Sequence, residues 1–261
     1  MSASLGDARL VVTAGRVVGR WYGYRSYDTV PVTAGEQVVV VHDDATGGVL
    51  AVAVGNELGP RRTGALGGVA AQCLAPVDRP ITVALIGAGT QAWAQLWALG
   101  SVVELGAVRV FSRAGSTRHA FAARARSELA VPAEPASDAR SAVRVADIVV
   151  LATNSSTPVI DCDWLRDDVL VTTLGPRQLG RAEFPADLVT DAAQLVTDSL
   201  AQLNAYDPPA IAASQSQLVI NELGALVAGE VAPQRSGRRV FLSVGLAGTE
   251  VHLLGHLAEP R

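Results

Sequence analysis

The stretch ITVALIGAGTQAWAQLWAL, residues 81–99, decides the fold class. It opens with an apolar run without polar alternation, which is typical of a strand buried on both faces. The run ends in a G-x-G-x-x-A turn and continues into a helical pattern. In this dinucleotide-binding fingerprint Gly87 makes the tight turn, Gly89 lets the backbone approach a pyrophosphate, and Ala92 lets helix and strand pack closely. A glycine turn that only serves packing is the alternative.

The start of the following helix and the end of the next strand predict which dinucleotide binds. Thr90 and Gln91 begin the helix, whose free N–H groups and positive dipole end favour phosphate. The second strand, AVRVFSR, ends in Ser112 and Arg113, where an acidic residue would hold the adenosine ribose of NAD. A guanidinium there would pair with a 2′-phosphate, so we expect NADP(H), with NAD(H) as the alternative.

The remaining pattern predicts an α/β protein with two domains. From residue 81 to about 205 apolar strands alternate with helices, which indicates a Rossmann-type, doubly wound parallel sheet. Residues 1–78 alternate extended segments with turns such as DDATGG at 43–48, which predicts a smaller, mostly β domain. We expect residues 79–209 to bind NAD(P) and residues 1–78, completed by 210–261, to form a substrate and dimerisation domain.

The C-terminal part is expected to be helical. After DPPAI the apolar stretches QLVINELGALVAGEV and VFLSVGLAGTEVHLLGHL predict a helix, a loop and a second helix. A short terminal helical piece needs a partner for its apolar face, so we expect it to fold back onto the first domain.

Composition excludes several classes of function. The chain has 261 residues, 49% of them hydrophobic, and a net charge of −4. No basic cluster indicates nucleic acid binding, and no long apolar run or secretion signal indicates a membrane, so we expect a cytoplasmic protein. All basic residues other than histidine are arginines, so no lysine can form a Schiff base. Cys73 and Cys162 lie far apart, and His252 with His256 lack a third ligand, so no metal site is predicted.

Several runs together resemble the ornithine cyclodeaminase/mu-crystallin family. They are HDDATGGVLAVAVGNELGPRRTGALGGVAA at 42–71, the glycine turn, VRVFSR, ADIVVLATNSSTPVI at 146–160 and FLSVGLAGTEV at 241–251. The resemblance extends from about residue 23 to 255 and includes an L-x-x-x-R-T-x-A stretch before the turn. It implies hydride exchange between a nicotinamide and the carbon of a C=N group next to a carboxylate.

The resemblance also implies roles for individual residues. Arg62 stands where the family binds the substrate carboxylate, and the planar fork of arginine suits that ligand. A loop at the end of the strand IVVLATN is expected to contact the cofactor, although a turn held by its own side chains is the alternative. A return loop is expected to approach the nicotinamide. The residues of the two loops are Thr153, Asn154 and Ser155, and then Ser243 and Gly245.

Departures from the family pattern weigh against cyclodeaminase chemistry. Arg25 occupies the position of a lysine that works near the substrate, and Arg177 and Arg181 replace an aspartate and a lysine. Only Glu183 of that second group matches the family. Arginine keeps its proton, so the general base for ammonia loss is missing. The resemblance also implies a further carboxylate-binding arginine before the matched part, which Arg16 or Arg20 would replace, and a supporting role for Glu250.

These features together predict an NAD(P)H-dependent reductase of an imine or ketimine that carries a carboxylate. Arg25 and Arg62 would anchor the carboxylate, and Tyr24, Tyr27 or Glu183 would deliver the proton. Three alternatives stay open: a catalytically reduced, NADPH-binding, crystallin-like protein, a cyclodeaminase-like lyase, and a structural partner in a biosynthetic pathway. The resemblance, and the need to cover a Val-rich strand such as EQVVVVHD, predict a homodimer through the first domain.

Overall fold

The computed structural model describes residues 1–5, 8–29, 36–76 and 79–259. The chain divides into two compact units. Unit 1 comprises residues 1–62 and 246–261, and unit 2 comprises residues 63–245.

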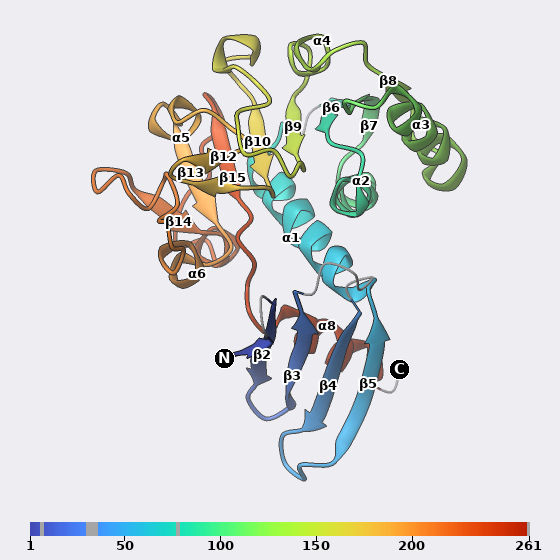
Figure 1. Cartoon of the computed structure of the whole chain (residues 1–261), viewed down its shortest axis with the longest axis vertical. Coiled ribbons are helices and arrows are strands. Elements are labelled where there is room, and N and C mark those ends of the chain that lie inside the picture. The colour runs from blue at the N-terminus through green and yellow to red at the C-terminus, as the bar shows by residue number, and fades with distance from the viewer. Residues whose placement is uncertain (6–7, 30–35, 77–78, 260–261) are drawn as a thin grey trace. The chain divides into compact units, whose positions relative to one another are not determined.

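Unit 1 is an antiparallel five-stranded sheet with one helix packed on it. The strands lie in the order β1-β2-β3-β4-β5. Their bounds are β1 (Ser2–Leu5), β2 (Ala8–Val17), β3 (Trp21–Asp28), β4 (Gln37–Asp43) and β5 (Val49–Gly55). Helix α8 (Thr249–Ala258) packs against β2, β3, β4 and β5 (Figure 1). Trp21, Val39 and Val41 from the sheet and Val251 from α8 form the core.

The predicted hairpin between β4 and β5 is confirmed. Asp43 holds the turn, because its Oδ1 accepts hydrogen bonds from the backbone N–H groups of Ala45 at 3.1 Å and Thr46 at 2.7 Å. Local bonds of this kind make aspartate a favoured turn residue. Strands β4 and β5, which this turn connects, pair along most of their length.

Glycines bring α8 very close to the sheet. Gly248, directly before α8, has a φ of +87° and lies against Gly15 of β2, where a Cβ would come within 2.6 Å of the Gly248 Cα. A Cβ on Gly255 would lie 2.5 Å from the ring of Trp21. Larger side chains would therefore push α8 away from the sheet.

Unit 2 is built on a parallel sheet of eight strands in the order β14-β13-β15-β10-β9-β6-β7-β8. The strands are β6 (Ile81–Ile86), β7 (Leu105–Phe111), β8 (Ala133–Pro135), β9 (Ile148–Leu151), β10 (Leu170–Thr173), β13 (Gln194–Thr197), β14 (Ile220–Glu222) and β15 (Arg239–Leu242). The pair β11 (Arg177–Gln178) and β12 (Arg181–Ala182) forms a small antiparallel ladder beside it.

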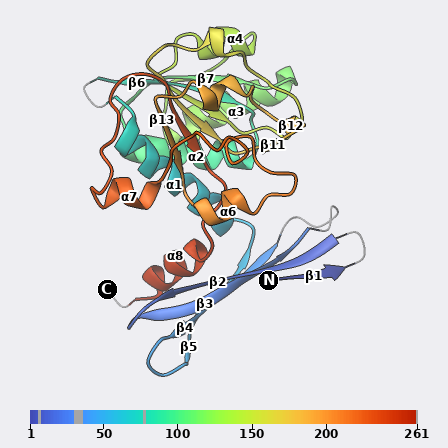
Figure 2. The same cartoon turned by 90° about the vertical axis from the view of Figure 1, so that its left-hand side faces the viewer.

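Helices cover both faces of this sheet (Figure 2). They are α1 (Leu58–Leu74), which begins in unit 1, α2 (Thr90–Val102), α3 (Gly115–Leu129), α4 (Ala139–Val143), α5 (Asp187–Thr190), α6 (Leu200–Asn204), α7 (Leu223–Val227) and a short 3-10 helix (Cys162–Trp164). Alternate residues of one strand pack into different cores: Val83 and Leu85 into one, Ala84 and Ile86 into the other. The predicted fold class is confirmed.

The C-terminal part differs from the helix, loop and helix expected there. Residues 239–242 form strand β15, which lies between β13 and β10 and is fully buried, and β14 adds the edge strand beyond β13. The compact units change at 62 and 245, whereas the sequence suggested changes at 78 and 209. Most of α1 belongs to unit 2, which moves the first boundary, and β14 and β15 complete the parallel sheet, which moves the second.

Candidate active site

The glycine turn between β6 and α2 has the geometry of an anion cradle. Gly87 has a φ of +113°, and a Cβ there would lie 2.2 Å from the carbonyl oxygen of Ala152. Around Gly89, which precedes α2, a Cβ would meet open space, and no side chain caps the helix. The first N–H groups of α2 therefore keep their hydrogen-bonding capacity, and Thr90 and Gln91 are exposed beside them. This arrangement fits a pyrophosphate.

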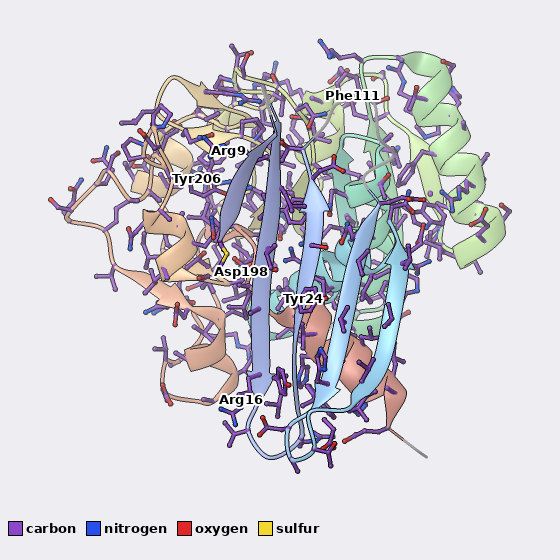
Figure 3. All side chains as sticks on the ribbon, turned by 60° about the horizontal axis from the view of Figure 1, so that its bottom comes forward. Arg9, Arg16, Tyr24, Phe111, Asp198 and Tyr206 are labelled. Atoms are coloured by element: carbon purple, nitrogen blue, oxygen red, sulfur yellow. The ribbon has the colours of Figure 1, made fainter. Side chains whose placement is uncertain are left out.

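The end of β7 carries positive charge. The side chain of Arg113 is exposed, and the Ser112 hydroxyl donates to the carbonyl of Ala114 at 3.0 Å. Arg118 of α3 donates from Nη1 to the Ser112 carbonyl at 3.0 Å, and its guanidinium lies 5.5 Å from the ring centroid of Phe111, labelled in Figure 3. The first turn of α3 has no acidic residue. Two arginines, Arg113 and Arg118, thus stand at the end of β7.

Glu183 is a buried carboxylate surrounded by hydrogen-bond donors. It is fully buried, and its carboxylate accepts four hydrogen bonds. Oε2 accepts from the backbone N–H and the hydroxyl of Thr153, both at 2.8 Å. Oε1 accepts from the N–H groups of Leu174 at 3.2 Å and Gly175 at 2.5 Å. Burial raises the pKa of Glu183, against the opposing effect of the bonds from Thr153. Through these bonds Glu183 joins the loops after β9 and β10, and its expected catalytic role stays a prediction.

Arg177 joins the next pair of loops. Its guanidinium is 5% exposed and donates to the carbonyls of Leu174 and Gly175 after β10 and to that of Ser243 after β15. The ring of Tyr206, labelled in Figure 3, lies 5.7 Å from the guanidinium carbon. A permanently charged donor with three carbonyl acceptors cannot act as a general base. The position where the resemblance expects an acid therefore has a structural cation.

Asp198, which sequence reasoning missed, holds the return loop from its other side. It follows β13, and its carboxylate accepts from the N–H of Val244 at 2.8 Å and of Gly245 at 3.0 Å. Gly245 has a φ of +97°, and the buried hydroxyl of Ser243 has no hydrogen-bond partner among the described residues. The only signal in the sequence was an aspartate directly after a buried strand. Both predicted residues of the return loop thus lie in a loop fixed at two points.

The loop after β9 has the turn geometry that was its alternative interpretation. The N–H of Ser155 donates to the Thr153 hydroxyl at 3.2 Å, and the Ser155 hydroxyl donates to the Thr157 carbonyl at 2.6 Å. Asn154 is exposed. This loop lies beside the glycine turn, because Ala152 contacts Gly87. The predicted cofactor residues of unit 2 therefore come together at the carboxyl edge of the sheet, where ligands bind in open α/β folds.

Unit 1 brings two of the predicted arginines onto one carboxylate. Arg25 of β3 and Arg62 of α1 each donate to Oε1 of Glu250 in α8, both at 2.7 Å. The side chains of Arg25 and Arg62 are 12% and 13% exposed and that of Glu250 is 1% exposed. Arg25 also lies 4.1 Å from the ring centroid of Tyr27, and burial lowers its pKa, which Glu250 opposes. Two cations share one anion, so the cluster has an excess positive charge.

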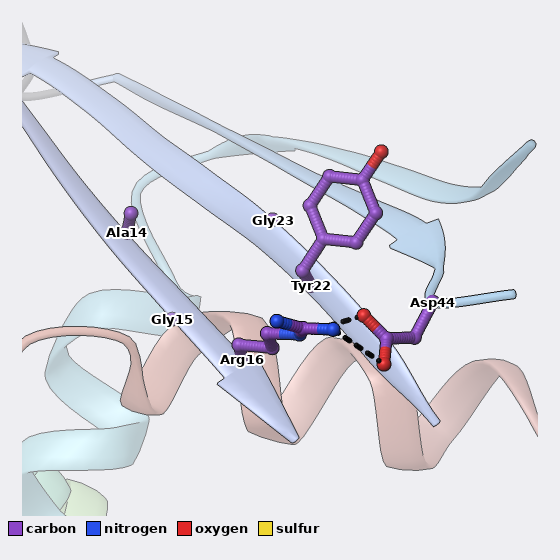
Figure 4. Close-up of a pocket in the computed structure, with 6 residues that line it drawn as sticks. All are labelled: Ala14, Gly15, Arg16, Tyr22, Gly23 and Asp44. Atoms are coloured by element: carbon purple, nitrogen blue, oxygen red, sulfur yellow. Dashed lines mark hydrogen bonds and ion pairs between the residues drawn. The ribbon is translucent and has the colours of Figure 1, made fainter. Parts of the chain in front are cut away.

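Neither arginine suggested as a further carboxylate ligand joins this cluster. Arg16 pairs with Asp44 on the sheet, with Nε to Oδ1 at 2.7 Å, and Arg20 pairs with Glu259. Arg16 and Asp44 line a separate cavity of about 620 Å³ (Figure 4). In the pairing of β2 with β3, Arg16 is directly opposite Tyr22. Tyr22 and Arg25 are an odd number of residues apart in β3, so the Arg16 side chain lies on the opposite face of the sheet from that of Arg25.

Within residues 1–5, 8–29, 36–76 and 79–259, no three histidine, cysteine, aspartate or glutamate residues come together as metal ligands would. Over the same ranges, no helix is long and apolar enough to span a bilayer.

Comparison with known proteins places these features in one family. Residues 20–259 match the model of the ornithine cyclodeaminase/mu-crystallin family. A Delta(1)-pyrroline-2-carboxylate reductase of Bacillus cereus is 31% identical over 229 residues, which is 85% of this chain and 70% of the relative. The ketimine reductase mu-crystallin of Mus musculus is 23% identical, over 86% of this chain and 69% of the relative.

Solved structures have the same fold. Delta(1)-pyrroline-2-carboxylate reductase from Thermococcus litoralis, in complex with NADH and L-proline, superposes with a TM-score of 0.86 at 24% identity, covering 99% of this chain and 84% of that one. A probable ornithine cyclodeaminase from Bordetella pertussis gives a TM-score of 0.85 at 25% identity, covering 98% and 83%. By the extent of its family match and its identity to the Bacillus reductase, the chain belongs to the ornithine cyclodeaminase/mu-crystallin family.

Proposed function

We propose that this chain is an NAD(P)H-dependent oxidoreductase that reduces an imine or ketimine carrying a carboxylate. One observation carries the proposal: Arg25 and Arg62 converge on Glu250 with an excess positive charge, in a chain that also has an uncapped dinucleotide turn. An excess of guanidinium over carboxylate, with the forked donors of arginine, selects a carboxylate ligand. The 31% identity to pyrroline-2-carboxylate reductases supports the same substrate class.

The cofactor is a nicotinamide dinucleotide, which supplies the hydride when it is bound. Gly87, Gly89 and the start of α2 accommodate its pyrophosphate. We favour NADP(H), because Arg113 and Arg118 stand at the end of β7 without an acidic residue in the first turn of α3. NAD(H) is the alternative, since the relatives of known structure from Thermococcus litoralis and Paracoccus denitrificans were solved with NADH and NAD+.

Reduction of the C=N carbon also needs a proton for the nitrogen. Of the three candidates, Glu183 is engaged in four hydrogen bonds, and Tyr24 is on the opposite face of β3 from Arg25 because the two are adjacent in a strand. Tyr27 shares the face of Arg25 and contacts it. We therefore assign proton delivery to Tyr27.

A second candidate function is a binding protein that holds NADPH without turnover. It is favoured by Arg177, which occupies the acid position and has three carbonyl acceptors. The same observation makes the cyclodeaminase-like lyase less suitable, because no general base stands there.

We further propose that two copies associate through the sheet of unit 1. The face that α8 leaves uncovered has large exposed side chains: Tyr22 at 38%, Tyr24 at 41%, Val52 at 56% and Val54 at 70%. An apolar patch of this kind marks an interaction surface. A relative of known structure, an archaeal alanine dehydrogenase, is described as a dimer with bound NAD.

The two cysteines, which are unpaired and lie in unit 2, suit the reducing environment of the cytoplasm.

The test is the absorbance of NADPH mixed with the protein and, in turn, pyrroline-2-carboxylate, piperideine-2-carboxylate, and pyruvate with a simple amine. Oxidation of NADPH with one of them is the expected result. Arg62→Ala should raise KM at least tenfold, whereas Arg61→Ala, the matched control one residue earlier, should not. Arg113→Ala should weaken the binding of NADPH but leave the binding of NADH unchanged. NADPH binding with no turnover of any substrate would refute the reductase in favour of the binding protein, and no binding would refute both.

A further inference from the structure

We propose that Glu250 sets the charge of the substrate that this chain accepts, and limits it to monocarboxylates. The inference rests on the proposed function, because it concerns the same carboxylate site. Arg25 and Arg62 contribute two positive charges, and the single carboxylate of Glu250 compensates one of them. The remaining charge matches one substrate carboxylate and leaves a second one without a counter-charge.

Glu250 is held in place by the packing of α8, at a position in the helix that favours a negative charge. It belongs to the first turn of α8, where the helix dipole favours a negative charge. The contact between Gly248 and Gly15 fixes the start of this helix on β2. The Thr249 hydroxyl, 3.5 Å from Oε2, donates to the Leu246 carbonyl at 2.8 Å. At 1% exposure Glu250 is shielded from solvent, so its charge acts strongly on its neighbours.

The cluster still has the donors that a carboxylate requires. Arg25 Nε and Arg62 Nη1 are buried and have no hydrogen-bond partner in the described parts of the chain. The buried hydroxyl of Thr13 is likewise unpartnered, and Thr13 is directly opposite Arg25 in the pairing of β2 with β3. Buried polar atoms cost stability unless they are satisfied. These three donors suffice to give each oxygen of a carboxylate a hydrogen bond.

Among the described residues of unit 1, the ion pairs seen in this cluster are those of Arg25 and Arg62 with Glu250. The ring of Tyr27 lies against the guanidinium of Arg25. Arg9 is on β2 four residues from Thr13, roughly 13 Å away at the rise of a strand. It is exposed to solvent, so its charge is screened from a ligand at Arg25 and Arg62.

The test compares two planar, non-reducible ligands that differ by one carboxylate, pyrrole-2-carboxylate and pyrrole-2,5-dicarboxylate. Their dissociation constants are measured by calorimetry on the full chain with NADPH present. The wild type should bind the dicarboxylate no more tightly than the monocarboxylate. Glu250→Gln, which keeps the shape and removes the charge, should shift the ratio of the two constants toward the dicarboxylate by about tenfold.

Glu250→Asp separates charge from positioning. It keeps the negative charge but shortens the side chain, so it should weaken both ligands and leave their ratio as in the wild type. If Glu250 were only a support for the arginines, Glu250→Gln would weaken both ligands equally, and that result would overturn the inference. If Glu250→Gln does not fold, the wild type decides alone: a dicarboxylate bound more than tenfold tighter overturns the proposal, as does binding of neither ligand.

The outcomes separate this inference from the proposed function. Imine reduction by the wild type with an unchanged ratio in Glu250→Gln would refute the role of Glu250 and leave the reductase intact. A shifted ratio without turnover of any imine would support the charge-setting role and refute the reductase.

Discussion

Replacing Glu183 by glutamine should destabilise unit 2 by about 2–4 kcal/mol. The four donors around this buried carboxylate are the N–H and hydroxyl of Thr153 and the N–H groups of Leu174 and Gly175. A glutamine amide can accept with only one of its two terminal atoms. The less costly orientation turns its NH2 group toward Thr153, whose hydroxyl can rotate away. One buried backbone N–H then loses its acceptor and faces another donor, which costs about 1–3 kcal/mol for the lost bond alone.

Urea denaturation followed by circular dichroism measures this loss. The expected result is a lower midpoint with an unchanged m-value, because the folded and unfolded surfaces stay the same. Glu134→Gln is the matched control: Glu134 is 67% exposed in its side chain and pairs with Arg109 at 3.3 Å, so its replacement should change the free energy of unfolding by less than about 0.5 kcal/mol.

The pH profile of imine reduction distinguishes a structural from a catalytic Glu183. A structural carboxylate leaves the pKa values of the profile where they are, although the rate falls as the loops after β9 and β10 loosen. If Glu183→Gln unfolds at the same urea concentration as the wild type and loses one limb of the profile, the carboxylate acts on the substrate and the structural interpretation is wrong.

Two further predictions concern unit 2. Burial opposes ionisation of Asp147, but hydrogen bonds from Arg79 at 2.6 and 2.8 Å and from the Thr82 N–H at 2.9 Å outweigh this effect and lower the pKa of Asp147. The ionised carboxylate therefore stabilises the fold above about pH 4, and this stabilisation is lost as the pH falls through the lowered pKa. Asp147→Asn should therefore cost about 2 kcal/mol at pH 7 and progressively less as the pH falls below about 4 through the lowered pKa, and a cost that stays constant over this fall in urea titrations would contradict the pairing. Burial raises the pKa of the Cys162 thiol to about 12, so at pH 8 Cys162 should react with Ellman's reagent only on unfolding. Cys162→Ala should therefore leave unchanged the reaction that the folded protein gives through its other thiol, Cys73. A smaller fast phase in Cys162→Ala would show that the thiol is accessible.

The fold class was predictable because its signals are local. The turn at Gly87 and Gly89 follows a buried strand directly, and the hairpin at residues 43–48 is bounded by two Val-rich runs. Each signal depends on residues within a few positions of one another, so neither needs knowledge of distant parts of the chain.

Strand β15 was not predictable in this way. Residues 239–242 are a short apolar run, and a run of that length fits a buried strand or part of a buried helix equally well. Its identity is decided by β10 and β13, which flank it in the sheet and come earlier in the sequence. The expected domain boundary at 209 followed from the same ambiguity.

The candidate site was predictable in its residue types and only partly in its contacts. The resemblance to a known family pointed to Arg25 and Arg62, but the carboxylate that joins them comes from α8, at Glu250, near the other end of the sequence. No spacing pattern connects residues so far apart. Glu183 matched the family in sequence, and only its burial among backbone donors separates support from catalysis.

The order of elements in unit 1 has a consequence for synthesis. Strands β1 to β5 leave the ribosome first, all of unit 2 follows, and α8 emerges after it. Until then the nascent sheet exposes Trp21, Val39 and Val41, the residues that α8 covers in the finished protein. Arg25 also waits for its counter-ion over that interval. We therefore expect the early chain to depend on chaperone shielding, and a chain interrupted before α8 to be degraded even when unit 2 has folded.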